Sequence, residues 1–235
     1  MKQSSWFTFL RYSIRDIVFG LEDGLVSTVG VLTGIASGTD DHFIVILSGI
    51  VLIMVEALSM GVGSFLSAQS ERELQSRQRD DIERLVSEHP EQAQKQLVTA
   101  YQELGLSATM VKPWLATLGK KPKSFGRELA MHQVGPVFKT EQNTIINGIC
   151  MFFSYILGGA VPVLPYFVLP VSVAIFWSVP LTVAALFLVG AVKGKIVHKN
   201  WWYSGLQMAL VSCTAALMGY LIGKLVAHLW GVPVV

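Results

Sequence analysis

Charged residues are scarce in this sequence. Only 14% of its 235 residues are Asp, Glu, Lys or Arg, whereas soluble domains carry about 25%. Hydrophobic residues make up 52% of the chain, and the mean hydropathy is +0.52. The shortage of charge argues against a soluble globular protein and indicates an integral membrane protein.

Cysteines and catalytic motifs are also few. Cys150 and Cys213 form neither a metal-binding spacing nor a disulfide framework, so we expect both to be small residues of a core. No Ser/His, Cys/His or HExxH constellation and no phosphate-binding glycine loop is present, which predicts that the chain is not an enzyme. The basic residues do not cluster with aromatic ones, so we expect no nucleic-acid partner. The first apolar run is too long for a cleavable signal peptide.

Five apolar segments are long enough to cross about 30 Å of hydrocarbon as helices. They run over residues 17–37, 43–68, 144–163, 168–192 and 203–229. A polar, helix-prone stretch separates the second from the third. We therefore predict an all-α membrane protein with five transmembrane helices and a cytoplasmic helical insert between helices 2 and 3. The predicted domains are residues 1–69, residues 70–142 (the insert, of a metal-binding type) and residues 143–235.

Helix boundaries follow from proline and glycine. The second span is expected to continue without a break to Glu88, where His89-Pro90 stops it. Within the insert, Pro90 opens a helix that Gly105 closes, Ser107 caps a helix that ends at Gly119, and a last helix covers residues 124–134. Pro162 and Pro165 are expected to end span three and to lead through a tight turn into span four.

The Lys and Arg positions predict the topology. Three precede the first span, eleven lie in the insert and three lie between spans four and five, whereas connections 38–42 and 164–167 have none. The N-terminus and the insert are thus expected in the cytoplasm and the C-terminus outside, with Lys224 as the one exception. Because the chain is compact and shows no targeting tails, we expect the cell membrane of a prokaryote rather than a vacuole.

Two apolar spans contain carboxylates, which cost roughly 2.5–3.5 kcal/mol each at the centre of a bilayer and are therefore rarely without function. Asp16 and Asp23 are two helical turns apart and share a face of span one. In span two, Glu56 and Met60 are neighbours at positions i and i+4. The structural alternatives are that Met60 fills the core and that Asp16 caps a helix N-terminus.

A carboxylate beside a thioether suits a borderline metal such as Fe(II), whereas Mg or Ca prefers oxygen ligands only. Two carboxylates on one pathway would also hold protons, because like charges raise each other's pKa. An arriving metal ion displaces such protons from its ligands. The four residues in the spans, Asp16, Asp23, Glu56 and Met60, are therefore our candidates for a path of metal ions and protons.

The insert offers a second, weaker set of ligands. Asp80 and Glu83 share one helix face, and Glu91 opens the next helix. Glu128 and His132 lie on the last helix of the insert. Carboxylates on facing helices can bind divalent ions. The alternative is a solvated polar face, supported by the arginines interleaved with the acidic residues.

Several segments together carry a resemblance that covers nearly the whole chain. They are DIVFG at 16–20, DGLVST at 23–28, LSMGVGSFLSAQSERE at 58–73, HPE at 89–91, YQELGL at 101–106 and GGAVPVLPY at 158–166. In these segments, their order and their spacing, the chain resembles the vacuolar iron transporter family.

The resemblance implies a homodimer of five-span protomers that exports Fe²⁺, and often Mn²⁺, from the cytosol in exchange for protons. These metals are substrates, and no resident cofactor is implied. The family's path residues at the dimer interface match Asp16, Asp23 and Met60, and Glu56 belongs to the same helix face. The insert departs from the family pattern, because Gln94 and the segment 133–135 (QVG) stand where the family has carboxylates. The alternative is a metal-responsive regulatory or structural membrane protein that does not transport.

Overall fold

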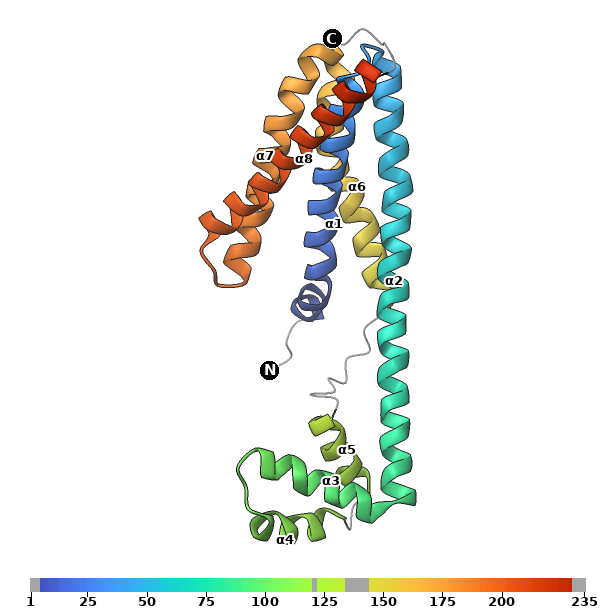
Figure 1. Ribbon diagram of the computed structural model, residues 1–235, viewed down its shortest axis with the longest axis vertical. Coiled ribbons are helices and arrows are strands. Elements are labelled where there is room, and N and C mark those ends of the chain that lie inside the picture. The colour runs from blue at the N-terminus through green and yellow to red at the C-terminus, as the bar shows by residue number, and fades with distance from the viewer. Residues whose placement is uncertain (1–4, 120–121, 134–143, 230–235) are drawn as a thin grey trace. The chain divides into compact units, whose positions relative to one another are not determined.

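The computed structural model describes residues 5–119, 122–133 and 144–229, and in these ranges every regular element is an α-helix (Figure 1). The helices are α1 (Ser5–Ala36), α2 (His42–Glu88), α3 (Pro90–Glu103), α4 (Ala108–Gly119), α5 (Pro122–Gln133), α6 (Thr144–Val168), α7 (Val171–Ile196) and α8 (Trp201–Leu229). The chain divides into two compact units. Unit 1 comprises residues 1–66 and 143–235, and unit 2 comprises residues 67–142.

Unit 1 contains the membrane-spanning part. Five helices are long and apolar enough to cross a bilayer, namely residues 13–36 of α1, the apolar part of α2, and α6, α7 and α8. This confirms the prediction of a five-span, all-α membrane protein. Their outward faces are apolar, as lipid contact requires, so an apolar residue need not lie in the core. Cys213 accordingly is exposed on α8, and its expected core position was wrong, whereas Cys150 is half-buried.

The end of span three also differs from the expectation. Pro162 and Pro165 do not terminate α6 but lie buried inside it, and the helix continues to Val168. A spanning helix tolerates proline where neighbouring helices supply hydrogen-bond partners. The Ser178 hydroxyl of α7 donates to the carbonyl of Pro162 at 2.7 Å, which connects α7 to this part of α6. Pro170 then stands at the N-cap of α7, where its missing N–H costs nothing.

Helix α1 holds unit 1 together, because it packs against α6, α7 and α8 (Figure 1). Small residues allow the close approach. A Cβ atom at Gly24 would stand 2.4 Å from the carbonyl oxygen of Tyr155 on α6. Further along α1, a Cβ at Gly219 of α8 would stand 1.9 Å from the carbonyl oxygen of Gly30. These contacts fix the position of α1 along its own axis. They therefore also fix how far along the bundle Asp16 and Asp23 lie.

Unit 2 is a small helical unit with its own apolar core. Leu97 of α3, Leu115 of α4 and Leu129 of α5 are fully buried at its centre. Helix α3 begins at Pro90 as expected and ends in a left-handed glycine, Gly105, at φ +87°. The N–H of Leu106 donates to the Tyr101 carbonyl and that of Gly105 to the Gln102 carbonyl, at 3.1 and 2.9 Å. These are the two hydrogen bonds of a Schellman cap.

The other boundaries near unit 2 are close to the expected ones. Helix α2 runs unbroken to Glu88, and α4 ends at Gly119. Helix α5 begins at Pro122 rather than at residue 124, because proline is well suited to the first turn of a helix. The expected end of α5 at residue 134 lies outside the described residues.

Candidate ion pathway

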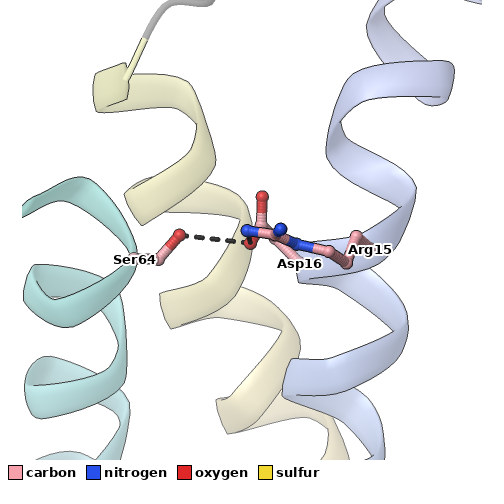
Figure 2. Close-up of polar contacts among 3 residues, drawn as sticks. All are labelled: Arg15, Asp16 and Ser64. Carbon is pink, nitrogen blue, oxygen red and sulfur yellow. Dashed lines mark hydrogen bonds and ion pairs between the residues drawn. The ribbon is translucent and has the colours of Figure 1, made fainter. Parts of the chain in front are cut away.

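Asp16 is buried in unit 1 with only 2% of its surface exposed. The Ser64 hydroxyl of α2 donates to its Oδ1 atom at 3.2 Å, and Figure 2 shows the two side chains facing one another. The Arg15 guanidinium lies 3.9 Å from the same oxygen, but its side chain is 80% exposed. Such an exposed, long contact compensates little of a buried charge. Because α1 begins at Ser5, Asp16 is in the helix interior, and the alternative that it caps the N-terminus was wrong.

Asp23 is half-buried two turns further along α1. The carboxylate of Glu56 on α2, also half-buried, lies close enough to interact with it through space. Two carboxylates from different helices thus approach each other within the apolar bundle. Like charges in this position favour the binding of a cation or a proton between them.

A pair of hydroxyl groups connects these two carboxylate residues. The Ser27 hydroxyl lies 2.7 Å from the Asp23 carbonyl oxygen and 2.5 Å from the hydroxyl of Tyr155 on α6. The Tyr155 hydroxyl in turn donates to Glu56 Oε2 at 3.4 Å. Each hydroxyl has one proton, so two protons serve three contacts. Either hydroxyl can therefore be the donor in the contact between Ser27 and Tyr155, and a change of donor requires only the rotation of hydroxyl hydrogens.

Met60 lies one helical turn beyond Glu56 and is half-buried. It packs against the core cluster that includes Tyr155 and Ala57. Because positions i and i+4 lie on one helix face, its thioether is on the side of α2 that carries Glu56. Its packing suits the core-filling alternative, and its place next to Glu56 suits a soft ligand.

Sequence reasoning missed Ser27, Tyr155 and Ser64. Ser27 follows Asp23 by one helical turn, and that spacing was the available signal. Tyr155 lies within an apolar stretch, and only the folded arrangement of the helices brings its hydroxyl to Ser27 of α1 and Glu56 of α2. Ser64 likewise meets Asp16 only across two helices.

The candidate ligands of unit 2 do not gather in the same way. Asp80, Glu83 and Glu91 are exposed. Within the described residues, no three His, Cys, Asp or Glu side chains come together in an arrangement that could hold a metal ion. Glu128 accepts a hydrogen bond from the Tyr101 hydroxyl at 2.6 Å, and the His132 Nε2 atom lies 3.7 Å from the same Glu128 oxygen. Residues 134 and 135, part of the divergent segment, lie outside the described range.

Tyr101 joins the three shorter helices of unit 2. From α3 it bonds Glu128 of α5, and its ring packs edge-on against His132 of α5 and Trp114 of α4, with centroids 4.5 and 5.3 Å apart. Burial and the neighbouring Glu128 carboxylate raise the pKa of Tyr101 to about 12. Glu128 and His132 are thus engaged in holding the unit together.

Comparison with known sequences places this geometry in a family. A sequence model of the VIT family matches residues 14–224. The chain belongs to the VIT family. The protein named vacuolar iron transporter 1 of Arabidopsis thaliana is 26% identical over 216 residues, 92% of this chain and 86% of that protein. Its namesake in Eucalyptus grandis is 27% identical over 214 residues, 91% of this chain and 86% of that protein.

A similar protein is also found in a prokaryote. A protein of Methanocaldococcus jannaschii described as uncharacterized is 28% identical over 210 residues, which cover 89% of this chain and 88% of that protein. The region matched by the VIT family model contains every candidate residue of both units, from Asp16 to Tyr155.

Proposed function

We propose that this chain transports Fe²⁺, and also Mn²⁺, out of the cytosol in exchange for protons. Its place in the VIT family and the names of its plant relatives support the transport of iron. The five apolar helices support a multi-pass membrane protein. The similarity to an archaeal protein supports a prokaryotic cell membrane as its location.

The observation that carries the proposal is that the hydroxyls of Ser27 and Tyr155 lead from the Asp23 backbone carbonyl to the Glu56 carboxylate inside the bundle. The carboxylates of Asp23 and Glu56 both come from helices that cross the membrane, where an ionisable group is a candidate for an ion path. With Met60 one turn away, a cation would meet hard oxygen and soft sulfur ligands. That combination favours Fe²⁺ over Mg²⁺ or Ca²⁺.

Exchange for protons follows from the same chemistry. A carboxylate must be deprotonated to bind a metal ion, so metal arriving on one side displaces protons, and protons arriving on the other side release metal. The hydroxyls of Ser27 and Tyr155 keep Glu56 within reach of polar partners in both states.

The proposal includes a homodimer whose path lies between the two protomers, and an orientation with the N-terminus and unit 2 in the cytoplasm. The homodimer is inferred from the resemblance to the family. The orientation is inferred from the distribution of lysine and arginine. Cross-linking of single cysteines on α1 between protomers, and the labelling of cysteines in unit 2 from one side of the membrane, test these two points.

Transport is tested in proteoliposomes that contain an iron-sensitive dye, with an imposed pH gradient. We expect Fe²⁺ uptake that the gradient accelerates and that Mn²⁺ competes for, and we expect Asp23→Asn to abolish it. Asp40→Asn, in the exposed turn before α2, is the matched control and should transport normally. Equal rates with and without the gradient would contradict proton exchange. Metal binding without uptake would favour a regulatory protein instead.

A further inference from the structure

The turn between α7 and α8 concentrates positive charge. Lys193, Lys195, His198 and Lys199 lie within seven residues and are exposed. No acidic residue follows Glu141 in the sequence. Among the described residues, none of the three lysines has a carboxylate within ion-pair distance. The charge of this turn is thus available to an anion from outside the chain.

The backbone of the turn is fixed. The N–H of Lys199 donates to the carbonyl of Gly194 at 2.8 Å and that of His198 to the carbonyl of Lys195 at 3.2 Å, which closes α7 with a Schellman cap. The Asn200 side-chain oxygen accepts the N–H of Trp202 at 3.1 Å and caps α8. The basic side chains are therefore presented from a rigid base.

His198 occupies the left-handed position of this cap at φ 54°, the one non-glycine residue with positive φ among those described. Helices usually place glycine there, because a Cβ atom is unfavourable in that conformation. The chain has an imidazole at this position despite the conformational cost. A residue kept in such a conformation is a reason to look for a function of its side chain.

Aromatic rings surround the basic residues. Trp201, Trp202 and Tyr203 are 45%, 57% and 70% exposed, and the Lys195 ammonium lies 5.9 Å from the Trp201 ring centroid. Exposed Trp and Tyr at the end of a spanning helix are typical of the membrane–water interface. The lysines next to them are then at the level of the lipid headgroups.

We propose that the α7–α8 turn binds the headgroup of an anionic phospholipid. Its phosphate would be held by the lysines and His198, and its acyl chains would lie on exposed apolar side chains of α7 such as Leu188 and Val192. Charge complementarity favours this occupant, because no lysine of the turn is paired with a carboxylate among the described residues. Topology alone requires lysines in this turn but does not account for the histidine in the left-handed position.

The test uses the full-length chain reconstituted in phosphatidylcholine with spin-labelled phosphatidylglycerol or phosphatidylcholine. Electron paramagnetic resonance then measures which lipid the protein retains at its surface. We expect the wild type to select phosphatidylglycerol, and we expect the triple variant K193Q/K195Q/K199Q to lose selectivity by about fivefold for each lysine that acts on the lipid. His198→Gly should also lose selectivity while its thermal stability is maintained or increased.

Lys224→Gln, near the opposite end of α8, is the matched control and should select lipid as the wild type does. Unchanged selectivity in the triple variant or in His198→Gly would overturn the proposal. An equal loss in Lys224→Gln would show a general charge effect and would overturn it too. Displacement of the lipid by millimolar inorganic phosphate would show a site for free anions instead. These measurements involve no metal transport, so their outcome is independent of the proposed function.

Discussion

The hydroxyl of Tyr155 lies 2.5 Å from the hydroxyl of Ser27, and this contact joins α6 to α1 inside the membrane-spanning bundle. The same Tyr155 hydroxyl reaches Glu56 of α2 at 3.4 Å. Tyr155 is fully buried, so its ring has little freedom to turn away. Three helices that carry the candidate path are therefore coupled through one phenolic oxygen.

Tyr155→Phe removes this oxygen and retains the packing of the ring. We expect the apparent affinity for transported Fe²⁺ to fall about 10- to 100-fold, as is usual when a group that orients a metal ligand is lost. The KM of uptake in proteoliposomes measures the effect. Tyr220→Phe, on α8, is the control and should behave as wild type. An unchanged KM in Tyr155→Phe would mean that the hydroxyl does not orient Glu56.

Gly219→Ala tests the packing of α8 on α1. The added Cβ would meet the Gly30 carbonyl oxygen at 1.9 Å, and a rigid backbone cannot yield to it. We expect a loss of about 1–3 kcal/mol in the free energy of unfolding, as overpacked sites show, measured by unfolding in detergent. The control is Gly63→Ala, where nothing lies within 4 Å and the substitution should leave stability equal or higher.

Tyr101→Phe tests the junction of unit 2. The loss of the hydrogen bond to Glu128 should lower the stability of this unit by about 1 kcal/mol. Amide hydrogen exchange of α3 and α5 in the full-length protein measures the change. Thr99→Ala, on the exposed side of α3, is the control, and an equal effect there would argue against a special role for Tyr101.

The same tyrosine predicts a pH dependence. Its pKa is raised from 10.0 to about 12 in the folded chain, so the neutral hydroxyl is favoured by folding. This contribution is fully present below pH 10 and is lost as the pH rises through about 12. We expect exchange protection of α3 and α5 to fall in that interval in the wild type but less in Tyr101→Phe. Parallel curves for the two proteins would contradict this assignment.

The double variant D80N/E83Q tests unit 2 as a metal site. Both side chains are exposed, and no metal-binding group of three forms among the described residues. We therefore expect Fe²⁺ uptake and the heat of Mn²⁺ binding to remain within about twofold of the wild type, a difference of less than 0.5 kcal/mol. A marked loss of heat in calorimetry of the full-length chain would restore unit 2 as a site of metal capture.

The length and apolar character of five segments were sufficient to predict the spans, because a bilayer restricts the choice to long apolar helices. Proline was less informative. Pro90 and Pro170 mark helix starts, whereas Pro162 and Pro165 lie within α6, where a spanning helix tolerates proline.

Of the candidate path, the carboxylates were predicted because they are costly in lipid, and Met60 because it lies one helical turn from Glu56. Asp16, Asp23 and Glu56 stand out in a sequence because a buried carboxylate is rare, and their roles as path residues stay predictions. Tyr155 is an ordinary residue of an apolar helix, and its importance depends on contacts across more than a hundred residues of chain. Contacts between residues so far apart in the chain leave no local pattern in the sequence from which they could be predicted.

The position of α1 also has a consequence for the order of biosynthesis. Its partners α6, α7 and α8 all lie later in the chain, and glycines of α8 fit against glycines of α1 without room for a methyl group. While the ribosome is still producing unit 2, Ser64 and Glu56 on α2 are already available to Asp16 and Asp23, whereas the three helices that pack against α1 are not yet made. The bundle around α1 is therefore complete only after the final helix has been made.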